Sequence, residues 1–155
     1  MGKLRVYVDT SVFGGCFDEE FAEASRTFLR QVESGRFTLV SSALVQEELE
    51  PAPAHVQEIF AEYIDAAELV DVSEDTIALR QAYMDAKIVP EKALTDALHV
   101  ALATSSQCDI LVSWNFQHIV HYRRIPLYNA VNVLHGYGSI SIYSPLEVIE
   151  YEENL

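Results

Sequence analysis

The first residue that could do chemistry is Asp9, which directly follows the apolar run Val6-Tyr7-Val8. A short β-branched and aromatic run predicts a buried strand. The carboxyl end of such a strand lies at the sheet edge where open α/β folds place their sites. An ionised carboxylate there is costly unless something compensates its charge. A metal ion, another cation or solvent could do so, and the sequence around Asp9 leaves all three open.

Two further acids lie on predicted helices. Glu47 belongs to a short helix after the second predicted strand, and we expect its neighbour Glu48 to point elsewhere, toward solvent. Asp96 lies near the start of an alanine-rich helix and is the only acid between Glu91 and Asp109. The residues about one turn away are apolar, so the helix face of Asp96 is apolar. A simpler alternative is that Asp96 only stabilises the positive end of its helix.

Polar side chains also follow the ends of two predicted strands. Thr10 and Ser11 come directly after Asp9, and the fourth strand runs into Ser113-Trp114-Asn115. Hydroxyl groups at these places could orient Asp9 or a water on a metal. Plain turns are the alternative, because Ser, Thr and Asn are common in turns and caps.

These residues must be positioned by elements that alternate along the chain. Strands are predicted at residues 4–8, 37–40, 69–72, 110–113 and 140–143. Helices are predicted at residues 18–32, 55–66, 76–87 and 91–105, after Ser41 or Ser42, as two weak segments within 116–133, and after Pro145. Alternation predicts a parallel sheet with helices on both faces. We therefore expect a single α/β domain over residues 1–155, a three-layer α/β/α sandwich with a mostly parallel sheet of about five strands.

Composition narrows the classes of function. The formal net charge of −14 argues against broad, non-specific nucleic-acid binding, and it suits a basic partner or simply solubility. Cys16 and Cys108 match no zinc spacing, and we expect both to be reduced. No apolar stretch is long enough for a membrane span, and the N-terminus does not look like a secretory signal. These features predict a cytoplasmic protein that does not enter a membrane.

Taken together, these motifs resemble the PIN-domain family, and within it the VapC-like toxin ribonucleases. Members have an apolar strand ending in Asp-Thr-Ser, a Ser-rich segment leading to a helical Glu, and an Asp on an alanine-rich helix. A later strand runs into Ser or Thr, a variable residue and an acid. The corresponding residues here are Asp9-Thr10-Ser11, Ser41-Ser42 with Glu47, Asp96, and Ser113-Trp114-Asn115. The match spans nearly the whole chain, and its main departure is Asn115, where many members carry Asp.

The resemblance implies a catalytic set of Asp9, Glu47, Asp96 and Asn115. The three acids would hold Mg²⁺ or Mn²⁺, since crowded carboxylates recruit a cation and oxygen ligands select hard ions. The expected reaction is hydrolysis of RNA phosphodiester bonds. Asn115 offers an oxygen without a charge, so we expect one well-held metal ion and a second that binds weakly or arrives with the substrate. The resemblance also implies a homodimeric toxin held inactive by a small antitoxin protein.

Other interpretations remain open at this point. A catalytically weak or inactive PIN-like domain that binds RNA or protein is favoured by Asn115 and by the acidic charge. A phospho-acceptor receiver domain would need a Lys after its last strand, and no Lys follows Lys92. Arg123 and Arg124 could contact RNA phosphates, with a solvated charge pair as an equal alternative. His99 could line the same cleft as Asp96, although structural roles are expected for the histidines in general.

Overall fold

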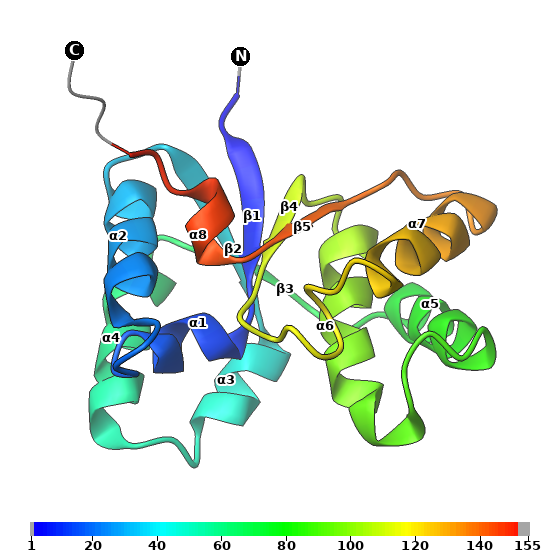
Figure 1. Cartoon of the computed structure of the whole chain (residues 1–155), viewed down its shortest axis with the longest axis horizontal. Coiled ribbons are helices and arrows are strands. Elements are labelled where there is room, and N and C mark those ends of the chain that lie inside the picture. The colour runs from blue at the N-terminus through cyan, green and yellow to red at the C-terminus, as the bar shows by residue number, and fades with distance from the viewer. Residues whose placement is uncertain (1, 152–155) are drawn as a thin grey trace.

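One fully parallel sheet forms the centre of the molecule in the computed structural model, which describes residues 2–151 (Figure 1). The strand order is β3-β2-β1-β4-β5. The strands are β1 (Leu4–Val8), β2 (Phe37–Ser42), β3 (Glu68–Val70), β4 (Ile110–Val112) and β5 (Ser141–Tyr143). The predicted α/β sheet of five strands is confirmed.

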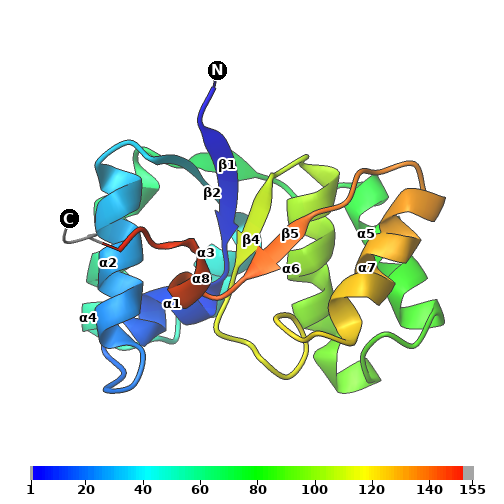
Figure 2. The ribbon, with the colours of Figure 1, turned by 45° about the horizontal axis from the view of Figure 1, so that its top comes forward.

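Helices cover both faces of this sheet, as the two views in Figures 1 and 2 show. One layer contains α1 (Thr10–Gly15), α2 (Ala22–Glu33), α4 (Ala54–Ile64) and α8 (Pro145–Val148). The other contains α5 (Glu74–Asp85), α6 (Leu94–Ser105) and α7 (Arg124–Leu134). The short α3 (Ala43–Leu49) continues from the carboxyl end of β2. The three-layer arrangement predicted from alternation is thus present.

The strand order reverses at β1, and this reversal decides where a site can form. β1 pairs with β2 on one side and with β4 on the other. Val8 lies opposite Val112 in the β1–β4 register, so Asp9 and Ser113 emerge side by side at the carboxyl edge. Open α/β sheets place their ligand crevices at such a reversal point.

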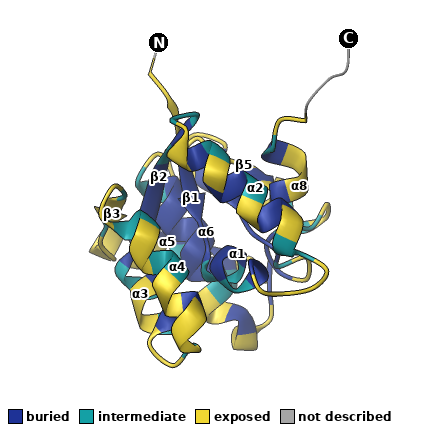
Figure 3. Cartoon of the chain, turned by 90° about the vertical axis from the view of Figure 1, so that its left-hand side faces the viewer, coloured by how far each residue is buried: buried dark blue, intermediate teal, exposed yellow. Residues whose placement is uncertain are grey.

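The core consists of the middle strands and the helix faces turned toward them (Figure 3). All side chains of residues 6–8 in β1 and of residues 111 and 112 in β4 are fully buried. On α6, every residue from Ala97 to Thr104 is buried, which explains its alanine-rich sequence, because small side chains let a helix pack closely on both sides. Among the described helices, none combines the length and apolar character needed to cross a bilayer.

Three elements differ from the sequence prediction. α1 was not predicted, and α2 begins only at Ala22 because Asp18–Phe21 forms a turn. The alanine-rich helix is preceded by a 3₁₀ turn, η1 (Glu91–Ala93). The two weak segments predicted within 116–133 are one helix, α7, because the backbone carbonyl of Asn115 accepts from Ile119 and Val120 and closes the preceding residues into turns.

Candidate functional site

Asp9 is held rigidly at the reversal point of the sheet. Its Oδ1 accepts hydrogen bonds from the backbone N of Ser11 at 3.0 Å and from the Ser11 hydroxyl at 2.5 Å. Its Oδ2 accepts from the hydroxyl of Ser113 at 2.9 Å. The side chain therefore caps α1 and bridges β1 to β4 at the same time. Both Ser11 and Ser113 act directly on the orientation of this carboxylate.

The charge of Asp9 is poorly compensated. Burial raises the pKa of Asp9, and nearby His99 together with the hydrogen bonds from Ser11 and Ser113 only partly opposes this rise. A buried carboxylate in this condition favours a nearby cation, since the cation stabilises the ionised form. Of the three compensating groups that the sequence left open for Asp9, burial disfavours solvent.

A second carboxylate, Glu48, is brought to the carboxyl edge by α3. Its Oε1 accepts from the Thr10 hydroxyl at 2.8 Å and lies 2.5 Å from Nε2 of His99. Burial disfavours its ionised form, but the hydrogen bonds from His99 and Thr10 outweigh burial and keep the pKa of Glu48 below its ordinary value. Thr10, which directly follows Asp9, therefore orients this second acid.

The imidazole that contacts Glu48 is itself fixed from the core. Nδ1 of His99 and the hydroxyl of Ser42 each lie 2.8 Å from the phenolic oxygen of Tyr7. Burial raises the pKa of Tyr7, so its phenol stays protonated and can donate to Nδ1. Tyr7 thus holds the imidazole ring so that its Nε2 faces Glu48. His99 thus lines the site, as the sequence had left open.

The expectation that Glu48 points to solvent was wrong. Glu48 does not point to solvent but into the site, whereas the predicted ligand Glu47 is exposed. Within residues 2–151, Glu47 forms no side-chain hydrogen bond or ion pair with Asp9, Asp96 or their partners. The motif located the helix, but the buried positions Val45 and Leu49 decide which face turns inward.

Asp96 is held by a histidine from the loop after β4. Its Oδ2 lies 2.9 Å from Nδ1 of His118. The side-chain oxygen of Asn115 accepts from the backbone N of His118 at 2.9 Å, which fixes the turn that carries the imidazole. Asn115 therefore acts on Asp96 through His118, and His118 was not predicted as a site residue. Its separation from Asp96 along the chain leaves no local spacing that could have revealed the pair.

The two arginines predicted to contact RNA differ in their availability. Arg124 donates from Nε to the carbonyl of Gln117 at 2.8 Å and from its guanidinium to the carbonyl of Ile88. It therefore fastens the loop to the region before η1. Arg123 is exposed and lies beside Tyr122, to whose hydroxyl its Nε donates at 2.9 Å. Of the two, Arg123 has the guanidinium that a ligand can reach.

The family of the chain follows from comparison with known sequences. The family model described as PIN domain matches residues 6–118, a range that includes Asp9, Glu48, Asp96 and Asn115. The chain belongs to the PIN-domain family. No curated protein sequence matches it closely enough to count as a relative.

Solved structures share the fold of this PIN domain at low sequence identity. A chain of VapBC2 from Rickettsia felis bound to a promoter DNA fragment has 14% identity and a TM-score of 0.61, with coverage of 91% of this chain and 98% of that one. A DNA-bound VapBC from Salmonella typhimurium has 16% identity and a TM-score of 0.59, covering 92% and 98%. VapC20 from Mycobacterium tuberculosis, a toxin that cleaves the sarcin–ricin loop, has 14% identity and a TM-score of 0.51, covering 87% and 98%.

The side chains at this site of the PIN domain are of the type that binds a hard divalent cation. Asp9, Glu48 and Asp96 offer carboxylate oxygens, the ligands that Mg²⁺ and Mn²⁺ prefer. The poorly compensated charge of Asp9 favours such an ion. In the range 2–151, however, no three or more acids, histidines or cysteines are already grouped as a metal site. Glu48 and Asp96 are each paired with a histidine through one carboxylate oxygen.

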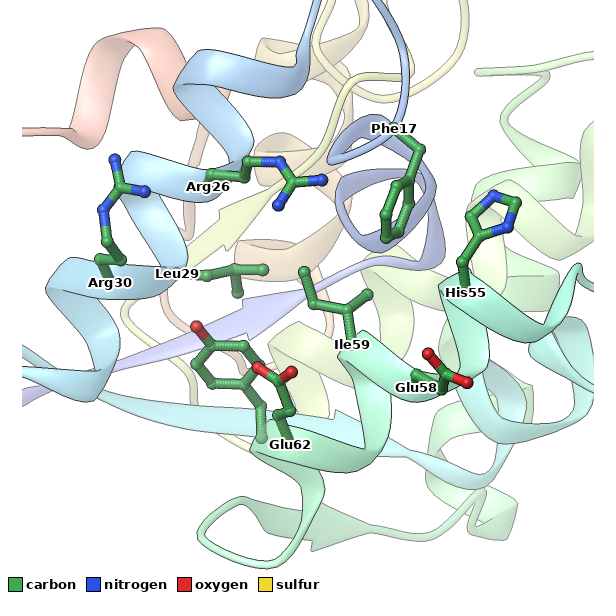
Figure 4. Close-up of a pocket in the computed structure, with 9 residues that line it drawn as sticks. Phe17, Arg26, Leu29, Arg30, His55, Glu58, Ile59 and Glu62 are labelled. Carbon is green, nitrogen blue, oxygen red and sulfur yellow. The ribbon is translucent and has the colours of Figure 1, made fainter.

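A cavity of about 320 Å³ lies between α2 and α4, away from these carboxylates (Figure 4). Its floor is apolar, with Leu29 and Ile59, and Arg26 and Glu62 lie on its rim. None of the predicted site residues lines it. This cavity is therefore separate from the candidate catalytic site of the PIN domain.

Proposed function

We propose that this PIN-domain protein is a ribonuclease that requires Mg²⁺ or Mn²⁺ and hydrolyses RNA phosphodiester bonds. The observation that carries the proposal is the buried carboxylate of Asp9, fixed by Ser11 and Ser113 at the β1–β4 reversal point. Glu48 from α3 and Asp96 from α6 are the further acids assigned to the site. The proposed metal ligands are therefore Asp9, Glu48 and Asp96, with Glu48 in place of Glu47.

Each part of the chain has a separate task in the proposed reaction. Asp9, Glu48 and Asp96 would hold the ion, and Thr10, Ser11 and Ser113 would orient the carboxylates. A bound ion supplies a water of lowered pKa and neutralises charge on the phosphate. His99 and His118 position Glu48 and Asp96 before the ion binds. Asn115 contributes by fixing His118 and adds no charge of its own.

Cleavage by the purified protein tests this proposal. A fluorescently labelled single-stranded RNA is incubated with the protein in Mn²⁺, in Mg²⁺ and in EDTA. We expect cleavage only with metal, and we expect Asp9→Asn to reduce the rate by at least about 100-fold, since removing a charge that stabilises the transition state costs several kcal/mol. Asp71→Asn is the matched control because Asp71 is exposed and follows β3, which β2 separates from β1. Metal-dependent cleavage retained in Asp9→Asn would refute the assignment.

A catalytically weak PIN domain that binds RNA is the second candidate. It is favoured by Asn115 at a position where many family members carry an acid, and by the histidine partners of Glu48 and Asp96. Calorimetric titration with Mn²⁺ separates the two candidates. No measurable binding of Mn²⁺, together with RNA binding but no cleavage, would favour this second function.

The biological role that we propose is that of a toxin in a toxin–antitoxin pair. The structures with the same fold include VapBC complexes, and the net charge of −14 suits a basic antitoxin segment. The cavity between α2 and α4 offers an apolar floor for such a partner. We also propose a homodimer, for which exposed Leu127, Val133 and Leu134 on α7 offer an apolar contact. Light scattering of the protein alone and co-expressed with the product of the adjacent gene tests both associations.

A further inference from the structure

The acids of this chain are distributed unevenly. The sequence contains 24 Asp and Glu residues, yet none lies between Asp109 and Glu147. The acid-free segment, residues 110–146, supplies β4, the loop after it, α7 and β5, and it includes Arg123 and Arg124. In Figure 1 it runs from the centre of the sheet outward along α7, in yellow to orange. This segment therefore adds no carboxylate of its own to repel a polyanion.

Two aromatic side chains are exposed within the loop between β4 and α7. The exposed fraction is 46% for Phe116 and 74% for Tyr122. The Tyr122 ring stacks on His121 with centroids 5.2 Å apart and planes inclined by 20°. The Arg123 guanidinium lies 5.5 Å from the centre of the Tyr122 ring. An aromatic face next to a cation is the combination with which proteins bind unpaired bases and the phosphates between them.

The same loop is tied to the candidate catalytic site. The backbone N of Trp114 donates to the Ser11 hydroxyl at 2.9 Å, and Ser11 holds Asp9. His118 holds Asp96. Phe116 lies between these two attachments along the chain, and Tyr122 lies four residues beyond His118. An RNA strand that stacks on both aromatic rings therefore runs along a loop that is hydrogen-bonded to the groups around Asp9 and Asp96.

We propose that residues 114–123 form the binding surface for unpaired RNA, with Phe116 and Tyr122 stacking on bases and Arg123 contacting a phosphate. This inference rests on the proposed function and narrows its substrate to single-stranded or looped RNA. Arg124 is excluded from the RNA contacts because its guanidinium is engaged with the carbonyls of Gln117 and Ile88. A duplex hides its base faces, so it cannot use the aromatic rings in this way.

Binding measured without cleavage tests the inference. The anisotropy of a labelled ten-nucleotide RNA is followed in EDTA, as a single strand and as a duplex with its complement. We expect Tyr122→Ala and Phe116→Ala each to weaken single-strand binding about tenfold, the usual effect of removing one stacked base contact. Arg123→Gln should weaken binding of the single strand and of an abasic oligonucleotide alike. Tyr151→Ala and Arg30→Gln are the matched controls, since both residues are exposed and lie outside the acid-free segment.

The outcomes separate this inference from the proposed function. Binding that depends on Phe116 and Tyr122 in a protein that cleaves nothing supports the surface and refutes the ribonuclease. Cleavage by a protein whose Phe116 and Tyr122 variants bind RNA like the wild type refutes the surface and keeps the ribonuclease. A wild type that binds no RNA, or variants that change only the mass in solution, would assign the loop to a protein contact and overturn the inference. Circular dichroism and thermal melting establish that each variant is folded.

Discussion

Glu47 and Glu48 are neighbours with the same side chain, yet their surroundings differ. Consecutive residues of an α-helix are rotated by about 100° around its axis, so both cannot face the site. Glu48 accepts from Thr10 and lies against His99, whereas Glu47 is exposed. Substituting each of the two glutamates in the same way therefore tests the site, because the side chains are identical and only their positions differ.

Glu48→Gln is expected to lower metal-dependent RNA cleavage by about 100-fold or more, because an amide removes the charge that an ion needs. Glu47→Gln is expected to change the rate by less than about twofold, as is usual for an exposed residue without partners. Rates on the same labelled RNA, with Mn²⁺ affinity from calorimetry, measure both effects. The reverse order of the two variants would restore Glu47 as the ligand.

The sequence located the position of Asp9 more accurately than the orientation of Glu48 on its helix, for a physical reason. A strand end is defined by where an apolar run stops, and Val6-Tyr7-Val8 stops at one residue. A motif on a short helix leaves its rotation open until the packed positions are known. Val45 and Leu49 are the buried residues of α3, and Glu48 lies three after one and next to the other. This spacing was the available signal for Glu48.

At the scale of elements, α1 is the piece that the sequence did not reveal. Thr10–Gly15 has six residues with two glycines, too short for a helical pattern to emerge. Asp9 starts it as N-cap, and its far end packs where α2 and the loop after β4 meet. At that junction the Trp114 indole donates to the Ser25 hydroxyl at 2.8 Å and stacks on Phe21. The strands were predictable because their apolar runs record burial on both faces, whereas α1 depends on contacts distant in sequence.

Gly15 is required at this junction because no side chain fits there. A Cβ on Gly15 would lie 2.7 Å from the Ser25 hydroxyl oxygen and 2.8 Å from the indole nitrogen of Trp114. Gly15→Ala is therefore expected to lower the free energy of unfolding by about 1–3 kcal/mol, the usual cost of overpacking. Urea denaturation followed by tryptophan fluorescence measures the change and reports on Trp114 directly.

Gly14→Ala provides the control on the same helix. Within residues 2–151, a Cβ on Gly14 would have no atom within 4 Å apart from its two chain neighbours and the backbone of its own helix. Alanine there is expected to leave stability unchanged or raise it by up to about 1 kcal/mol, because alanine loses less backbone entropy in a helix than glycine. Equal destabilisation by both substitutions would show that α1 itself, and not its contact with Trp114 and Ser25, is the sensitive feature.

For the molecule as a whole, the net charge of the protein and the charge of the proposed RNA substrate are both negative. A protein of net charge −14 cannot attract RNA by its overall field, so affinity must come from local contacts and from any bound cation. Bases stacked on Phe116 and Tyr122 supply affinity that salt does not screen. Arg123 supplies one phosphate contact, which salt does screen. The acid-free segment adds no carboxylate of its own to these contacts.

The salt dependence of RNA binding follows from this balance. For single-stranded nucleic acid, each phosphate contacted by Lys or Arg contributes about −0.7 to the slope of log K against log salt. With Arg123 as the reachable guanidinium of the loop, we expect a slope between about −0.7 and −1.4 in EDTA, and a reduction of its magnitude by about 0.7 in Arg123→Gln. Anisotropy titrations at several KCl concentrations measure it. A slope of about −3 or steeper means four or more phosphate contacts, and it would place the RNA on the basic residues outside the acid-free segment, which lie among the acids that repel it.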